Sequence, residues 1–377
     1  MRRRRLHAGE PRARRDPCAR RADREGVAGA HPLAGEGRPR ARLCEPRRRE
    51  LVALEARAGE LPVSLVLLAI LPHVKWFTDP RPHPTRYDLL LSWPVVGAFA
   101  IALVAAGIAY LIQHRVPEPR AIRSLERYAR TGPLALRVAL GSSLVAAAIA
   151  GWLFVPSLPV ERDAAGYAIL GVETLCGLLI LVGLFTRFAA VLLAVLGAAA
   201  MFPFNVESIL EQVHILGIAV FLFIAGPGLL SLDARRRAHG ALEHEHAPAA
   251  ALNLLRVAMG FGIAYGALTE KLLNPPLAQA LLDQSPFLNV LRPLGVGDPV
   301  FIWIAGLTEL VIGVVIISGQ ITRPVMAIGF ALFSVTLIVF GLPEFIGHLP
   351  FYGIMLTLFI APDADSWRVR RALRDAA

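Results

Sequence analysis

Two glutamates inside long apolar segments are the residues of this sequence best placed for chemistry. Glu173 precedes Thr186-Arg187 by 13 residues, and Glu309 precedes Thr322-Arg323 by the same distance. If each Thr-Arg pair marks a tight turn at the cytoplasmic surface, each carboxylate lies roughly 20 Å along a helix toward the outside. Ionisable groups within the hydrocarbon are costly, so a functional role is their default interpretation. The alternative is a structural carboxylate that is hydrogen-bonded to a neighbouring helix.

More Glu, His and Lys residues stand at the outer ends of other apolar segments. Glu207, Glu211 and His214 are spaced i, i+4, i+7, so they share one helical face. The candidate intramembrane polar site therefore comprises Glu173, Glu309, Glu211, His214, Glu270, Lys271, Glu344 and His348. Such a cluster could relay protons or hold a quinone head group through hydrogen bonds. A metal site is not expected, because Glu and His spaced i, i+4 lack a third fixed ligand.

The composition is that of a membrane protein. Of the 377 residues 55% are apolar and only 18% are charged, against about a quarter charged in soluble chains, and the mean hydropathy is +0.55. The net charge of +10 is concentrated in residues 1–50, where 16 Arg and 7 acidic residues give +9. The body is nearly neutral, so no nucleic-acid partner is expected. None of the three cysteines forms a C-x-x-C pair, which excludes a dithiol centre of that kind.

Ten apolar segments are candidates to cross a bilayer. They cover residues 61–77, 91–113, 134–155, 167–185, 188–204, 213–230, 252–273, 299–318, 325–342 and 349–361. The first is short and lacks a cleavage site, so we expect an uncleaved anchor. Arginines concentrate in alternate loops and in the tail, which predicts that both termini are cytoplasmic. Arg137 and Arg256 lie near cytoplasmic helix starts, where we expect their side chains to reach the membrane surface.

The sequence also contains an internal repeat. Arg137-Val-Ala-x-Gly141 matches Arg256-Val-Ala-x-Gly260 at an offset of 119, and Glu173-x3-Gly177-x5-Gly183 matches Glu309-x3-Gly313-x5-Gly319 at an offset of 136. Each copy holds four predicted spans, an even number, so both copies share one orientation in the membrane. We therefore predict an all-α integral membrane fold of two tandem four-helix bundles, preceded by two N-terminal transmembrane helices.

These patterns divide the chain into six predicted parts. They are an Arg-rich disordered segment 1–55, a two-helix module with a cytoplasmic linker 56–132, a first repeat 133–233, a linker 234–250, a second repeat 251–363 and a basic tail 364–377.

Several stretches in both repeats resemble the DoxX-like family of small four-helix membrane proteins. The likeness is carried by Leu255-Arg-Val-Ala-x-Gly260 with Glu270-Lys-Leu-Leu273, by Glu173-Thr-Leu-Cys-Gly177 through Thr186-Arg187, and by Gly226-Pro-Gly-Leu-Leu-Ser-Leu-Asp233. The first repeat departs from the pattern at Gly151-Trp152, and the second lacks the Gly-Pro-Gly ending.

The resemblance implies a bacterial inner-membrane protein that acts as a membrane subunit of a quinone-linked or oxidant-defence redox assembly. A soluble or membrane oxidoreductase would then be its partner, and quinone the only cofactor to expect, because the sequence has no haem, flavin or iron–sulfur motif. No catalytic residue transfers with the resemblance. The alternatives are a proton-coupled transporter, a membrane receptor, or a scaffold that tolerates replacement of both Glu173 and Glu309.

Overall fold

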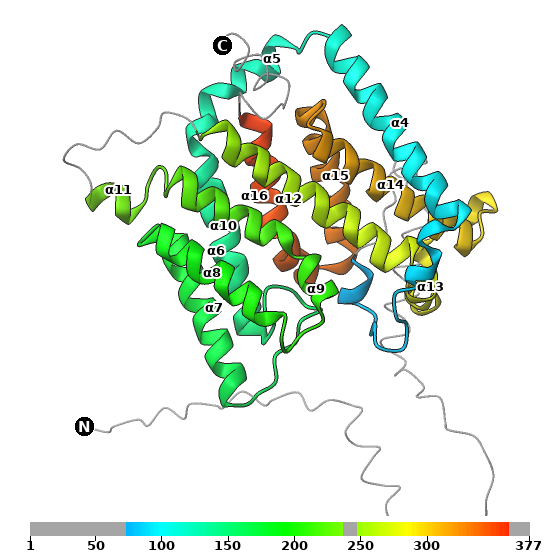
Figure 1. Cartoon of the computed structure of the whole chain (residues 1–377), viewed down its shortest axis with the longest axis horizontal. Coiled ribbons are helices and arrows are strands. Elements are labelled where there is room, and N and C mark those ends of the chain that lie inside the picture. The colour runs from blue at the N-terminus through cyan, green and yellow to red at the C-terminus, as the bar shows by residue number, and fades with distance from the viewer. Residues whose placement is uncertain (1–72, 237–246, 362–377) are drawn as a thin grey trace, which may run out of the picture. The chain divides into compact units, whose positions relative to one another are not determined.

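The computed structural model describes residues 73–236 and 247–361. The predictions made for residues 1–72, for the centre of the linker and for the basic tail lie outside the described residues. Within them the chain is helical, and its extended pairing is limited to one bridge between Trp152 and Pro159. Figure 1 shows the helices gathered into one bundle.

Nine apolar helices in the described residues occupy the positions of nine predicted spans. They are α4 (Trp93–Arg115), α6 (Gly132–Ala150), α7 (Ala164–Val182), α8 (Thr186–Ala200), α10 (Val213–Ala225), α12 (Ala249–Ala267), α14 (Asp298–Ser318), α15 (Thr322–Phe340) and α16 (Leu342–Ile360). By length and composition seven of the candidate spans can cross a membrane, and only α8 and α10 are shorter. An all-α, multi-pass membrane architecture is therefore confirmed.

Shorter elements connect these helices. They are η1 (Val74–Trp76), η2 (Tyr87–Leu91), α5 (Arg120–Arg123), η3 (Ser124–Thr131), α9 (Val206–Leu210), α11 (Leu232–Arg236), the π-helical turn η4 (Leu268–Leu272), α13 (Pro275–Gln284), η5 (Pro286–Leu288) and η6 (Arg292–Leu294). Two sequence-based boundaries shift. The end of the predicted first span forms the 3₁₀ turn η1, and α16 begins seven residues before the predicted 349, because Pro343 suits a first helical turn.

The tight turns expected before Thr186 and Thr322 are present. Gly183 ends α7 and Gly319 ends α14, both with left-handed backbone at φ 67° and 71°, which favours glycine. The Asp233 carboxylate accepts hydrogen bonds from the N–H groups of Phe185 and Thr186 at 2.9 Å each, and so caps the start of α8.

Close glycine contacts join the first two long helices of each predicted repeat. A Cβ on Gly141 of α6 would lie 2.7 Å from the carbonyl oxygen of Gly177 in α7. A Cβ on Gly260 of α12 would lie at the same distance from the carbonyl oxygen of Gly313 in α14. Glycine allows both helix pairs to approach closely. These matched crossings support the duplication, which stays a prediction.

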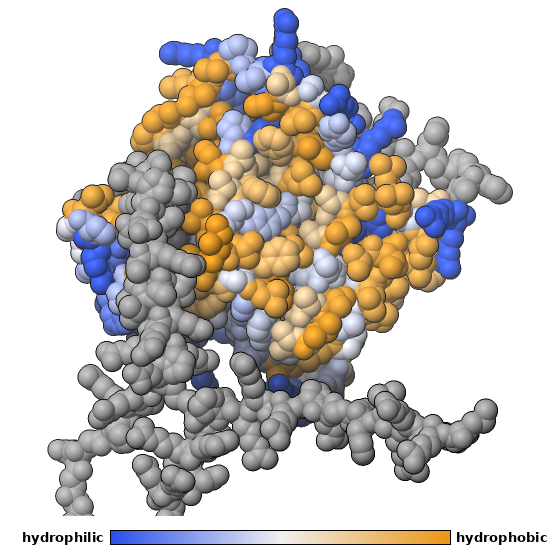
Figure 2. Space-filling model, turned by 180° about the vertical axis from the view of Figure 1, so that it is seen from behind, coloured by the Kyte–Doolittle hydropathy of each residue, from blue (hydrophilic) through white to orange (hydrophobic). Residues whose placement is uncertain are grey.

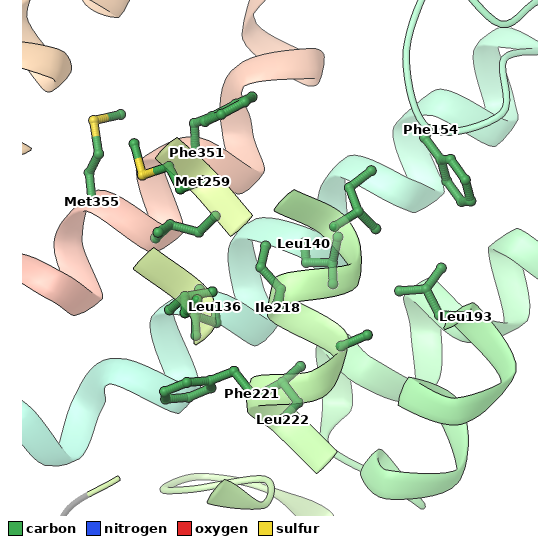
Figure 3. Packing of buried hydrophobic residues seen from close by; sticks show 14 of the residues in the cluster. Leu136, Leu140, Phe154, Leu193, Ile218, Phe221, Leu222, Met259, Phe351 and Met355 are labelled. Carbon is green, nitrogen blue, oxygen red and sulfur yellow. The ribbon is translucent and has the colours of Figure 1, made fainter. Parts of the chain in front are cut away.

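The two predicted repeats are joined by two helix pairs. The last helix of the second, α16, packs along α6, and the last helix of the first, α10, packs along α12. Their facing side chains form one hydrophobic core, part of which is shown in Figure 3. The labelled residues on these four helices are Leu136, Leu140, Ile218, Phe221, Leu222, Met259, Phe351 and Met355. This shared core fixes α10, α12 and α16 relative to one another, including the ends that are predicted to lie on the outer side.

Candidate functional site

Seven of the eight predicted polar-site residues lie in or beside one buried cluster at the predicted outer end of the bundle. The polar cluster comprises His73, Lys75, Glu207, Glu211, His214, Thr269, Glu270, Lys271, Glu309, Glu344 and His348. They come from η1 and the residue before it, from α9, from the residues that precede and begin α10, and from η4, α14 and α16. In Figure 1 η1, drawn in blue, lies beside α9 at this end.

One side of the cluster is built around the ammonium group of Lys75. Its Nζ donates to Glu207 Oε1 at 2.6 Å and to Glu211 Oε1 at 2.5 Å, and its side chain is only 2% exposed. The Thr269 hydroxyl also donates to Glu211 Oε1, at 2.5 Å. Glu207 accepts further hydrogen bonds from Tyr87, at 2.6 Å, and from Thr85. Since Tyr87 is 54% exposed, this side of the cluster reaches the surface.

The opposite side is built around the π-helical turn η4. Lys271 Nζ donates to Glu309 Oε2 at 2.8 Å and lies 3.6 Å from Glu270 Oε2. Glu270 accepts the N–H of Val74 at 2.8 Å, and its Oε1 lies 3.4 Å from the Nδ1 of His73. The wider π turn places Thr269, Glu270 and Lys271 all in buried positions, and such turns recur at functional sites.

Two further buried groups, the imidazoles of His214 and His348, lack hydrogen-bond partners at both ring nitrogens. Glu344 lies beside them, with Oε1 3.6 Å from His348 Nδ1 and the hydroxyl of Thr336 as a hydrogen-bonding neighbour. The two imidazoles are packed among aromatic rings instead. His348 stacks on Phe333 at 4.3 Å between ring centroids, and His214 stacks on Phe351 at 3.9 Å. Unpaired buried polar groups carry a desolvation cost, which is typical of sites that do chemistry.

Trp76 of η1 closes the cluster against α16. Its ring stacks on His73 at 4.4 Å and lies 5.1 Å from His348. A Cβ on Gly347 would lie 2.3 Å from this ring, so only glycine allows the indole to sit there. The turn at the end of the predicted anchor is therefore an integral part of the site.

Burial and ion pairing set the charges on the exposed side of the cluster. Burial opposes the charge of Lys75, but Glu211 and its other acidic neighbours raise the pKa of the ammonium above its ordinary value. For Glu207, burial is outweighed by Lys75, and the pKa of the carboxyl is lowered. Burial raises the pKa of Glu211 despite the same lysine. Of the two carboxylates that share Lys75, Glu211 therefore takes up a proton first.

Glu173, the eighth predicted residue, belongs to a separate site. Its Oε1 accepts the N–H of Phe154 at 2.8 Å, and Oε2 has no hydrogen-bond partner. Phe154 has a left-handed backbone, with φ 67°, in the loop between α6 and α7. The carboxyl thus stabilises a strained loop, and its partner is a loop N–H and not the neighbouring helix that the structural alternative expected.

The arginine markers of the repeat differ in their surroundings. Arg137 is fully buried and donates to the carbonyl oxygen of Leu229 at 2.7 Å, and Arg256 donates to the carbonyls of Ile316 and Ile317 at the end of α14. The prediction that both reach the membrane surface is wrong, because each guanidinium binds backbone carbonyls that a neighbouring segment leaves free.

The second Thr-Arg turn is also anchored by acidic residues. Arg323 pairs with Glu118 and, at 2.9 Å, with Glu126, while Arg187 is exposed.

Sequence reasoning placed most of the cluster but missed its first turn. His73 and Lys75 lie at the end of the predicted anchor and were not included in the predicted site. Glu207 was noted for its helical spacing but was not included in the site. The signal for Lys75 was the excess of carboxylates in the candidate set, since buried carboxylates need a cation.

The cluster is not arranged as a metal site. Within residues 73–236 and 247–361 no three His, Cys, Asp or Glu side chains are placed to hold a metal ion. The groups instead combine ion pairs near the surface with imidazoles that are packed among aromatic rings. No family model, curated protein or solved structure matches this chain.

Proposed function

We propose that this chain is the membrane subunit of a redox assembly that exchanges protons with a quinone-type carrier at the polar cluster. The single observation that supports the proposal is a buried set of titratable groups that begins at the exposed Tyr87 and continues to Glu344 and the unpartnered ring of His348. Proton exchange requires groups that can bind and release protons without leaving a buried charge unpaired. The ion pairs of Lys75 and Lys271 provide that compensation.

The aromatic surroundings of the two unpaired imidazoles suit a planar ring. Phe333, Phe351 and Trp76 offer stacking faces, while His214 and His348 offer hydrogen-bonding nitrogens. Reduction of a quinone to a quinol takes two electrons and two protons. In this proposal the protons pass through the cluster, and the electrons come from an oxidoreductase partner.

The test compares matched variants in cells that lack the gene. We expect Glu309→Gln and His348→Asn to lose quinone-linked respiration, while Glu173→Gln restores it fully because Glu173 lies outside the cluster. A mild-detergent purification of the intact chain should retain an oxidoreductase. Normal respiration without the gene, together with no retained oxidoreductase or quinone, would sink the proposal.

A proton-coupled transporter is the second candidate, and the π-helical turn η4 favours it. Transport sites are often built where a membrane helix is interrupted, and η4 interrupts the end of α12 at Glu270 and Lys271. Proteoliposomes that take up a solute only under a proton gradient, and that lose this uptake in Glu309→Gln, would select transport over redox chemistry.

A further inference from the structure

A long apolar groove runs along the membrane-facing side of the bundle, apart from the polar cluster. It has a volume of about 1230 Å³ and lies between α6, α15 and α16. Its lining extends from Leu342 to Phe359 on α16, about 25 Å at 1.5 Å per residue. The groove therefore runs in the direction of lipid chains and is nearly as long as the hydrocarbon core is thick. Figure 2 shows apolar side chains over much of the surface opposite to the view of Figure 1.

The groove offers few hydrogen bonds to a polar ligand. The hydroxyl of Ser142 already donates to the carbonyl oxygen of Val138 at 2.5 Å, and the Tyr352 hydroxyl lies 3.4 Å from that of Ser334. Its floor is fixed by a different contact. Pro350 has no N–H for the carbonyl of Ile346, and the Ser143 hydroxyl donates to that carbonyl at 2.7 Å instead. The groove is thus a fixed and almost wholly apolar surface.

The corresponding position in the second repeat carries bulky side chains. At the offset of 119, Ser142 and Ala146 of α6 correspond to Phe261 and Tyr265 of α12, whose rings stack at 5.4 Å. The helix contacts below correspond as well. A Cβ on Gly353 would lie 2.6 Å from the Cβ of Ala139, and a Cβ on Gly217 would lie 2.5 Å from that of Ala258. The same helix crossing thus carries two aromatic rings in one half of the molecule and two small side chains in the other.

We propose that the groove binds acyl chains of bilayer phospholipids, which take the place of this aromatic pair. A concave groove is not self-complementary, so a two-fold dimer of this chain does not fill it. Acyl chains are the most abundant apolar partner at this depth. They gain dispersion contacts from three helices at once, whereas a convex lipid-facing surface provides contacts on one side only. Binding here requires the membrane setting alone and does not depend on the proposed proton chemistry.

The test transfers the aromatic pair to the groove. We compare the full chain, purified in mild detergent, with the double variant Ser142→Phe/Ala146→Tyr. The matched control is Ala168→Tyr/Gly171→Phe on α7, where both residues are exposed and a Cβ on Gly171 would meet open space. Native mass spectrometry counts the phospholipids retained by each. We expect the wild type and the control to retain at least one, and the groove variant about tenfold less.

Thermal unfolding gives a second readout that separates filling from misfolding. Adding phospholipid to delipidated protein should raise the Tm of the wild type and of the control. The Tm of the groove variant should not change on addition of phospholipid, because the Phe and Tyr side chains already fill the groove. Its helical content should equal that of the wild type. Equal lipid retention by all three proteins would overturn the proposal, as would an isoprenoid quinone or a second copy of the chain retained in place of phospholipid. Retention by Glu309→Gln at the wild-type level is expected and separates this inference from the proposed function.

Discussion

Two glutamates at matched positions of the predicted repeats have different surroundings. Glu309 in α14 is paired with Lys271 and belongs to the polar cluster. Glu173 in α7 has no lysine partner and accepts a backbone N–H from the loop beside it. The positions that carry Glu270-Lys271 in the second repeat carry Gly151-Trp152 in the first. This difference at one helix end therefore accounts for the different surroundings of the two carboxylates. Glu309 belongs to an ionic network, and Glu173 holds a loop.

The comparison shows that a buried carboxylate gains its role from what its neighbours donate. A lysine links it to other charged groups, whereas a peptide N–H holds it in place without supplying a charge. The cluster also draws on the first repeat, since Glu211 and His214 precede and begin α10. The site is thus built by both halves, at the point where α10 packs on α12.

The largest effect is expected when the lysine that pairs with Glu309 is removed. Lys271→Met leaves Glu309 and Glu270 buried with less compensation, and we expect it to lower the free energy of unfolding by about 3–5 kcal/mol. Denaturant unfolding in detergent micelles, followed by circular dichroism, measures the loss.

A double variant provides the control for that loss. Lys271→Met/Glu309→Gln removes the uncompensated charge of Glu309 and should recover much of the lost stability. If the double variant were as unstable as the single one, the ion pair would not be the cause.

The second prediction tests the cation supplied by η1. Lys75→Met leaves Glu207 and Glu211 without their shared ammonium, and the expected loss is about 3 kcal/mol, at the lower end because Glu207 is partly exposed. Arg81→Met is the matched control, since the ion pair of Arg81 with Asp79 is exposed and contributes little. An equal effect of the two substitutions would mean that Lys75 is not a buried counter-ion.

Hydropathy and spacing predicted most of the fold. Apolar length located the nine described helices to within a few residues at most ends, because each must satisfy its own backbone within the hydrocarbon. The repeat pattern pointed to Glu309 and to its neighbours at the helix ends. The pairing of α6 with α16 and of α10 with α12 was not predicted, because glycine and alanine patterns mark close approach but not the partner helix.

The parts of the site that sequence missed depend on contacts between distant residues. Lys75 lies more than a hundred residues before Glu207, and no local spacing links them. The separate role of Glu173 depends on a left-handed residue, Phe154, in a loop whose path the sequence does not indicate. The buried positions of Arg137 and Arg256 likewise depend on which carbonyls the neighbouring segments leave unpaired.

The third prediction contrasts the two matched glutamates directly. Glu173→Gln keeps a carbonyl-type oxygen for the Phe154 N–H, so we expect a change of no more than about 1 kcal/mol in stability. Glu309→Gln weakens the pair with Lys271 and should cost more, about 2 kcal/mol. Both are measured by the same unfolding assay. A larger loss of stability in Glu173→Gln than in Glu309→Gln would mean that the carboxylate of the first repeat, and not that of the second, has the ionic role.

The smallest expected effect is a pH dependence that arises at Glu207. Lys75 lowers the pKa of this carboxyl in the folded protein although burial opposes it. A lowered folded pKa stabilises the protein above the unfolded value of about 4.3, and this stability is lost as the pH falls through the folded pKa. Between about pH 5 and pH 3 the wild type should therefore lose stability more steeply than Glu207→Gln.

Glu211 provides the opposite sign within the same ion pair. Burial raises its folded pKa, so its contribution is largest where it is protonated and declines as the pH rises through the folded pKa. Above about pH 4.3 the wild type should therefore lose stability as Glu211 ionises, and Glu211→Gln should abolish this loss. Glu207→Gln should leave the slope of stability against pH unchanged in this range. Unfolding midpoints measured from pH 3 to pH 8 test both, and parallel curves for the two variants would contradict the conclusion that Glu211 takes up a proton before Glu207.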